Sequence, residues 1–308
     1  MNDAYYTQTG ERPELASLEV NPPEGYIGNK ILPTVPVADK SGTVYYATVT
    51  ADSAAQTGRS AGAAPTGTQI SASSTTFTAA EAIKRGSVTP DEVKQMGGID
   101  KADEVGSKWA KRQVMAYLEG DIRTLILGGT KDVSFDPAKV QTQVQVALQD
   151  VRLYEGKSAL IGSTWTIKAM LQQMLGDNAY GPALARLVTG SSGVDAVRGL
   201  SLDAWKQSLA IFFGVDEVLC GDDTVWNATA VAGRFAIAKL DDGADELSHK
   251  WKPVLGKVFQ FLPDGKNPWL IESIADRLTK NNHYDATCWY DAVILNSGAF
   301  YLFDGVSG

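Results

Sequence analysis

The chain of 308 residues is poor in histidine and cysteine, two side chains on which many enzymes and metal sites depend. It has two histidines, His249 and His283, and two cysteines, Cys220 and Cys288. The cysteines are distant in sequence and lack CxxC spacing, which argues against a disulfide scaffold or a zinc site and suits a reducing compartment. Each cysteine is expected to be a small buried hydrophobe.

Common catalytic fingerprints are missing as well. The sequence has no GxGxxG dinucleotide turn, no Walker-type phosphate loop, no GxSxG elbow and no HExxH helix. The pairs Asp222-Asp223 and Asp241-Asp242 could hold a cation, but adjacent residues on turns point in different directions, so solvated loops are expected there. Both histidines are expected to be exposed and structural. No cofactor or metal is expected.

Long apolar runs and clustered basic charge are also absent. No uncharged apolar stretch approaches the roughly 18 residues of a membrane span, and the N-terminus lacks the pattern of a secretory signal. The formal net charge is −8. That charge disfavours a dedicated nucleic-acid binder, because phosphate contacts need clustered Lys and Arg. A folded protein made and used in a cytoplasm is therefore expected.

The strongest pattern present is an amphipathic stretch at residues 99–127, which predicts one helix about 43 Å long at 1.5 Å per residue. Its buried side is expected to carry Trp109, Met115, Leu118, Ile122 and Leu125. Its solvent side is expected to carry Asp103, Lys108, Lys111, Arg112, Glu119 and Arg123. Just before it, Thr89-Pro90-Asp91-Glu92 predicts the start of a short helix.

The chain before these helices has little core-forming sequence. A polar arm ends at Pro22-Pro23, and residues 43–49 predict a strand. Residues 51–76 consist mainly of small and hydroxyl side chains that cannot form a core of their own. Because only about 50 residues precede that segment, we expect it to leave the body and return, rather than to link two domains.

The second half of the chain mixes helices and strands. One helix is expected to open at Asp136-Pro137 and to continue until Gly156. Further helices are expected at 164–175 and 202–213, and strands at 158–161, 215–221, 234–240 and 254–261. Two more strands are expected around Asn296-Ser297-Gly298, and Asn281-Asn282 are expected in a polar turn. Since the elements do not alternate regularly, the predicted fold class is α+β.

The order of these parts resembles the major capsid proteins of tailed bacteriophages, which have the Hong Kong 97-type fold. Residues 26–37, YIGNKILPTVPV, are similar to that family's (Y/F)IA-(D/N)K-(V/L)-(F/L)P-x-V-x-V phrase, which precedes its extended loop. Residues 209–221, LAIFFGVDEVLCG, are similar to its helix-to-strand phrase LFGVERVLVG. Residues 79–127 occupy the place of the family's spine-helix region.

The resemblance implies an N-terminal arm at 1–33, an extended β loop at 34–78, a peripheral domain with the spine helix at 79–155, an axial domain at 156–271, and return strands of the peripheral domain at 272–308. The implied function is mechanical rather than enzymatic. Many copies would form the icosahedral head shell that encloses the phage genome, in a virion assembled in the host cytoplasm. A loop that rests on a neighbouring subunit needs no core of its own, which accounts for the small-residue segment.

The implied partners are copies of the chain itself, in hexamers and pentamers, and a portal protein. A separate scaffolding protein is expected because no built-in scaffolding region of about a hundred residues precedes the arm, and a decoration protein stays open. The enclosed DNA would not be bound by sequence, and no membrane is involved. No covalent crosslink is expected, since no motif pairs Lys40 with Asn281, Asn282 or Asn296. The expected inter-subunit contact residues are Tyr26, Ile31, Pro33, Val35, Tyr45, Tyr46, Arg59 and Trp109.

Two alternatives stay open. An encapsulin-like nanocompartment shares the capsid fold but would need a groove for a cargo peptide. An α+β enzyme without a recognisable motif would lose turnover on substitution of Asp222, Asp223 or His249.

Overall fold

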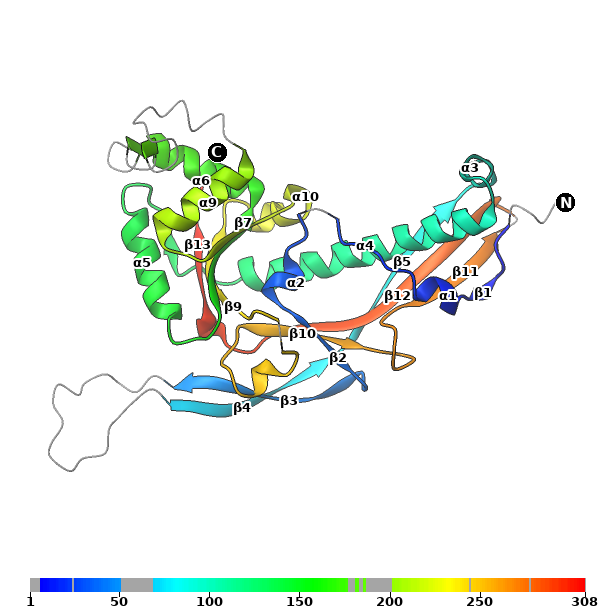
Figure 1. Cartoon of the computed structure of the whole chain (residues 1–308), viewed down its shortest axis with the longest axis horizontal. Helices are drawn as coiled ribbons and strands as arrows, with labels where there is room; N and C mark the ends of the chain where they lie inside the picture. The colour runs from blue at the N-terminus through cyan, green and yellow to red at the C-terminus, as the bar shows by residue number, and fades with distance from the viewer. Residues whose placement is uncertain are drawn as a thin grey trace.

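A computed structural model of the chain describes residues 6–23, 25–50, 69–176, 181–182, 185–186, 201–243, 245–276 and 278–307. Two sheets and one long helix dominate it (Figure 1). The predicted α+β class is therefore confirmed. No helix of the described residues combines the length and apolarity needed to cross a bilayer.

The long helix is α4 (Ile99–Leu127), which has the bounds that the sequence predicted. It follows α3 (Pro90–Met96), where Thr89 and Glu92 form the expected capping box: the Thr89 Oγ1 accepts from the Glu92 N–H, and the Glu92 carboxylate accepts from the Thr89 N–H. Gly97 ends α3 with φ +87°, a left-handed conformation that favours glycine.

A six-stranded sheet lies along α4. Its path runs β1 (Gly10–Glu11), β11 (Leu270–Asp276), β12 (Asn281–Ile294), β10 (Gly256–Phe261) and β2 (Thr34–Val37). β5 (Ala80–Val88) pairs antiparallel with the other edge of β12. Helix and sheet approach so closely that a Cβ on Gly106 would lie 2.3 Å from the Tyr284 ring. Glycine is required at that crossing.

This close approach reverses part of the prediction for α4. The residues that face the sheet are mostly small, and Trp109 and Leu125 are 49% and 36% exposed. Asp103, Lys111 and Glu119, expected in solvent, are buried. The apolar periodicity predicted the wrong side of the helix for these residues. The reason is that the N-terminal segment covers one side of the helix and supplies partners for its charges.

The five-stranded sheet is built from β6 (Val133–Ser134), β13 (Phe300–Asp304), β9 (Phe235–Leu240), β7 (Lys157–Ser163) and β8 (Glu217–Gly221), in that order. Three helices share an apolar core with it: α5 (Val140–Val151), α6 (Thr164–Gly176) and α9 (Leu202–Phe213). Phe235 and Phe303 stack at 4.5 Å in this core. Smaller helices follow at α10 (Asp223–Trp226), η2 (Thr229–Val231) and η3 (Ser248–Lys250).

The two sheets do not follow the sequence ranges expected for the domains. β10, within 256–261, pairs with β12 in the six-stranded sheet, and β13, within 300–304, pairs with β9 in the five-stranded one. The two predicted strands at the C-terminal end thus exist, on either side of η4 (Ser297–Ala299), but belong to different sheets. Asn281 and Asn282 lie in β12 rather than in a turn, and Asn282 is buried.

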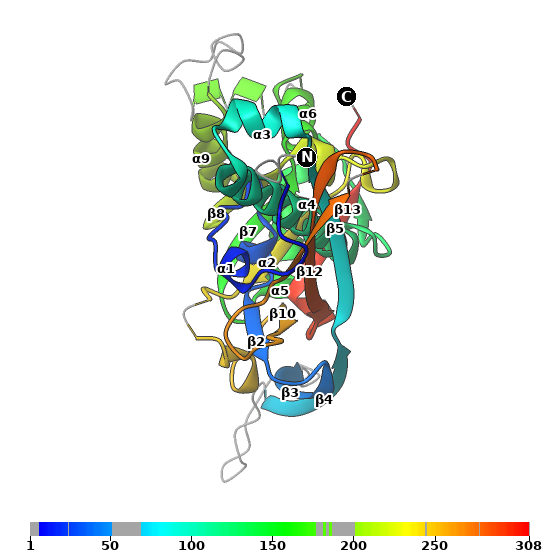
Figure 2. The same ribbon diagram turned by 90° about the vertical axis from the view of Figure 1, so that its right-hand side faces the viewer.

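A long hairpin extends below the two sheets in Figures 1 and 2. Its strands β3 (Ser41–Thr50) and β4 (Gln69–Thr78) pair over ten residues each. The return strand β4 draws mainly on the small hydroxyl residues that predicted no regular structure. The N-terminal segment carries α1 (Pro13–Ala16) and α2 (Gly28–Ile31), both near α4 (Figure 1).

Candidate subunit-contact surfaces

The hairpin is attached to the body through a small apolar seat. Phe77 of β4 stacks on Phe259 of β10, with ring centroids 5.0 Å apart, and Val35 and Val44 complete the cluster. The Asn296 side-chain amide donates to the Ala47 carbonyl at 3.1 Å. Beyond this seat, β3 and β4 pair only with each other among the described strands, so most of the hairpin surface is free to meet another molecule.

The three predicted contact residues of this loop have different surroundings. Tyr45 is 66% exposed, and Tyr46 is half-buried. Arg59 lies outside the described residues. Tyr45 is thus a large aromatic side chain in solvent on a projecting element, which is a common property of binding surfaces.

A second surface lies on the outer side of α4. A groove of 650 Å³ is lined by Tyr26, Val105, Lys108, Trp109, Arg112, Gln113 and Ala116. Tyr26 and Trp109, predicted from different segments, meet here. The Lys108 ammonium is bridged to the Glu104 carboxylate at 2.5 Å, and Arg112 is exposed. The groove therefore combines apolar walls with positive charge at its rim.

Two other predicted contact residues are corrected by the structure. Ile31 and Val35 are 0% and 4% exposed, because α2 and β2 turn these side chains into the chain's own core. In this conformation they offer no surface to a second copy, and we do not retain them as contact residues.

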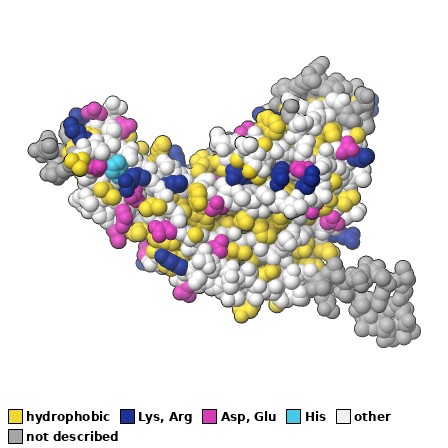
Figure 3. Space-filling model, turned by 180° about the vertical axis from the view of Figure 1, so that it is seen from behind, with side chains coloured by type: hydrophobic (Ala, Val, Ile, Leu, Met, Phe, Trp, Pro, Cys, Tyr) yellow, Lys and Arg dark blue, Asp and Glu magenta, His cyan; other side chains and the backbone are white. Residues whose placement is uncertain are grey.

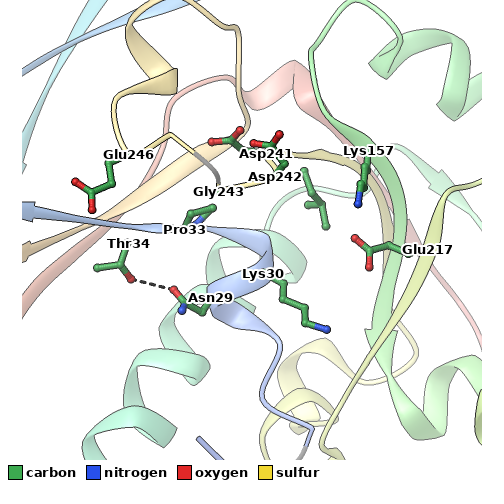
Figure 4. A pocket seen from close by; sticks show the side chains of 11 residues that line it. Asn29, Lys30, Pro33, Thr34, Lys157, Glu217, Asp241, Asp242, Gly243 and Glu246 are labelled. Atoms are coloured by element: carbon green, nitrogen blue, oxygen red, sulfur yellow. Dashed lines mark hydrogen bonds between the residues drawn. The ribbon is translucent and has the colours of Figure 1, made fainter. Parts of the chain in front are cut away.

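Pro33 is half-buried and lines a cavity of 430 Å³ (Figure 4). The cavity lies between α2, the strands β7 and β8, and the turn after β9. Lys30 and Lys157 line it together with Glu217, Asp242 and Glu246. Charges of both signs are mixed in this cavity.

Lys111 fixes the N-terminal segment to α4. Its fully buried ammonium donates to the carbonyls of Leu15, Ala16 and Leu18 at 2.8–2.9 Å. Burial, with a smaller contribution from Lys108, lowers the pKa of Lys111 to about 8. A second tie is Asp103, whose carboxylate accepts from the Tyr284 hydroxyl at 2.5 Å and from Arg12 at 2.9 Å.

We expect Lys111→Met to release the N-terminal segment while leaving the sheets folded. Three carbonyls would lose the ammonium donor, and of these the Leu15 carbonyl keeps a hydrogen bond from the Leu18 N–H. Each buried group left unsatisfied costs about 1–3 kcal/mol. Limited proteolysis should cleave the variant between α1 and α2 at least tenfold faster than the wild type. Lys101→Met, at an exposed position of the same helix, is the control, and equal cleavage rates for all three proteins would contradict the role of Lys111.

Glu119 joins three parts of the chain. Its Oε1 accepts from the Ile27 N–H at 2.7 Å and from the Trp226 Nε1–H at 2.6 Å, and both carboxylate oxygens accept from the Gly28 N–H. Burial raises the pKa of Glu119, and these donors act in the opposite direction. The sequence carried no signal for this role, since Glu119 is one charge among several on a helix.

The face seen in Figure 3 shows hydrophobic side chains gathered along the middle of the molecule, with charges of both signs scattered among them.

Comparisons with solved structures identify the architecture. A phage-related protein from Bordetella bronchiseptica RB50 matches with 15% identity, over 97% of this chain and 98% of its own, at a TM-score of 0.60. The capsid of a native GTA particle matches with 12% identity, over 94% of this chain and 93% of its own, at a TM-score of 0.50. This chain has a phage-capsid fold. The Hong Kong 97-type fold expected from the sequence is thereby confirmed. No protein-family model and no curated protein matches the chain.

Within this capsid fold, the acidic pairs considered for an enzyme have structural partners. Asp222 caps α10 through the Thr224 N–H, and Asp223 accepts from the Trp165 N–H, each at 2.7 Å. Asp241 is buried rather than solvated, with its Oδ2 2.6 Å from the Lys257 ammonium. The described residues hold no group of three or more metal-ligating side chains suited to an ion.

The two cysteines are buried as the sequence predicted, but the exposure predicted for His249 is wrong. His249, expected to be exposed, is 3% exposed, and His283 lies 2.8 Å from the Ser87 hydroxyl. Both cysteines are buried as expected, and burial raises the pKa of each thiol to about 11. A thiol with so high a pKa is a poor nucleophile at neutral pH.

Proposed function

We propose that this chain is a major capsid protein, many copies of which form the icosahedral head shell around the genome of a tailed bacteriophage. The observation that carries the proposal is the capsid fold itself, matched along nearly the whole length of both chains. The role is mechanical, without cofactor or catalysis. A nanocompartment shell of the same fold is the alternative, and it differs in enclosing a protein cargo rather than a genome.

The projecting hairpin supports assembly through contacts between copies. Its seat is small, so the remaining surface of β3 and β4 is available to a neighbouring subunit. We assign the contacts to Tyr45, Tyr46 and Arg59 in the loop and to Tyr26, Pro33 and Trp109 on the body. Residues 79–155 with 272–308 would form the peripheral domain, and residues 156–271 the axial domain, allowing for the strands that cross between sheets.

The proposed partners are further copies in hexamers and pentamers, a separate scaffolding protein, a portal protein and, where the shell needs reinforcement, a decoration protein. The mature location is the virion, after assembly in the host cytoplasm. Light scattering and negative-stain microscopy of the purified protein, with and without a candidate scaffolding protein, test the proposal. Shells, tubes or capsomer rings are expected, and a monomer of 32.9 kDa under all conditions would contradict it.

We expect Tyr45→Ala and Trp109→Ala to prevent assembly without unfolding the subunit. Both side chains are largely exposed, so each change should alter the free energy of unfolding by less than about 1 kcal/mol. Buried aromatic anchors at interfaces are worth about 2 kcal/mol or more each, a cost that is repeated at every contact of a shell. Thermal unfolding and sedimentation of the same samples separate the two effects.

The matched control is Leu278→Ala, which removes a 95% exposed side chain outside the assigned contacts. Assembly of both aromatic variants at wild-type yield would remove Tyr45 and Trp109 from the contact set, while the capsid assignment would stand if the wild type forms shells.

A further inference from the structure

Two buried polar atoms without a partner lie at the seat of the hairpin. Four buried side-chain polar atoms of the described residues make no hydrogen bond, and His249 Nδ1 and Asn296 Oδ1 are two of them. Asn296 holds the hairpin directly, through its amide bond to the Ala47 carbonyl. Because unsatisfied buried groups cost free energy, this joint is less secure than the rest of the core.

His249 reaches the hairpin through a short series of contacts. It lies in η3, which packs against β3. Its ring meets the Phe259 ring edge-on, with centroids 6.0 Å apart and an interplanar angle of 84°. Phe259 in turn stacks on Phe77 of β4. A displacement of η3 would therefore disturb the contacts that hold both hairpin strands.

The surroundings of His249 disfavour a positive charge on its ring. Lys257 on β10 faces it, and the single buried carboxylate, Asp241 at the end of β9, already accepts from the Lys257 ammonium at 2.6 Å and from the Ser248 hydroxyl at 2.5 Å. On its own segment, Lys250 adds positive charge. The Glu246 backbone and the Asp241 carboxylate favour the protonated ring, but burial and the two lysines outweigh them and lower the pKa of His249. A proton on His249 would put two cations against one carboxylate and would turn Nδ1 into a buried donor without an acceptor.

We propose that His249 is an acid-sensitive latch, which holds the β3–β4 hairpin against the body when neutral and frees it when protonated. The latch belongs to the single subunit, so it does not depend on the proposed capsid function.

The direction of the pH effect follows from the burial of the ring. Burial, and then the charge of Lys257, lower the pKa of His249 below its ordinary value of about 6.5. As pH falls, the open hairpin takes up the proton before the closed one does. Stability of the closed form is therefore lost as pH falls through about 6.5. The open fraction should rise between pH 7.5 and 5.5, by at most about tenfold, a limit reached if the closed form stays neutral throughout.

Hydrogen exchange of the full-length wild-type chain tests the proposal. Exchange rates of backbone amides in β3 and β4, corrected for the intrinsic pH dependence of exchange, should rise from pH 7.5 to 5.5, by at most about tenfold. Amides of β7, in the other sheet, should keep their corrected rates. In His249→Gln and His249→Phe, which carry no titrating ring, the hairpin rates should not depend on pH.

The chain's other histidine supplies the matched control, because His283→Gln should retain the wild-type response. Imidazole NMR, made unambiguous by that variant, should report a pKa for His249 below 6.5, and this measurement holds even where a substitution impairs folding. The proposal is overturned by hairpin rates that are equal at both pH values, by His249 variants that keep the wild-type response, or by a His249 pKa at or above 6.5.

Discussion

Lys257→Met is expected to destabilise the fold by about 3–5 kcal/mol, which is a large part of the roughly 5–15 kcal/mol that stabilises a typical domain. Lys257 is fully buried, and its ammonium lies 2.6 Å from Asp241 Oδ2. Without it, the Asp241 carboxylate stays buried without its cation, although the Ser248 hydroxyl still donates to it. The loss comes mainly from that uncompensated charge, since methionine fills much of the volume of lysine. Urea unfolding at pH 7 measures it.

A double substitution separates the charge from the packing. Lys257→Met combined with Asp241→Leu removes both charges and should recover most of the lost stability, because apolar residues can replace a buried ion pair at little cost. Lys239→Met, which removes a partly exposed lysine of β9, should change the free energy of unfolding by less than about 1 kcal/mol. A single variant as stable as this control would show that the pair does not hold β9 to β10.

The local elements could be predicted from sequence where their signals lie within one turn or one strand. α4 begins and ends where the periodicity and the glycine pairs place it, and the Thr89 capping box needs only four residues. The order of these parts was also sufficient to predict the capsid fold, which the comparisons bear out at 15% identity or less. The bounds of α4 and the capping box depend only on residues that are close together in the chain.

The buried side of α4 could not be predicted in the same way. It depends on Gly86 and Gly106, which let β5 and the helix approach, and on an N-terminal segment about 90 residues distant that encloses Lys111. A charge that finds three carbonyls only after folding looks like any solvated lysine in the sequence. The hairpin strand β4 was missed for a related reason, since its small hydroxyl residues gain order by pairing with β3 rather than from a core of their own.

Glu119→Ala is expected to cost about 3 kcal/mol or more and to loosen α4 from both of its neighbours. The carboxylate receives hydrogen bonds from Ile27, Gly28 and Trp226, and its removal leaves three buried donors, each worth about 1–3 kcal/mol. Trp226 is fully buried in α10 and bonded through its indole N–H. Its fluorescence emission should therefore shift to longer wavelength in the variant, while amide exchange at Ile27 and Gly28 should accelerate.

Two further substitutions separate the contribution of the Ile27–Gly28 segment to this loss of stability from that of Trp226 in α10. Trp226→Phe removes the indole donor alone, so it should leave the exchange of Ile27 and Gly28 near wild type while still lowering stability through lost packing. Glu119→Gln keeps one acceptor oxygen but turns an NH₂ group toward N–H donors. Its loss of folding free energy should therefore fall between the losses of Glu119→Ala and Trp226→Phe. If Glu119→Ala left the Ile27 and Gly28 amides protected, the carboxylate would not be what fixes this segment. If these amides instead lost their protection, one side chain of α4 would set the position of two elements: the segment that leads into the hairpin, and the α10 turn that follows β8.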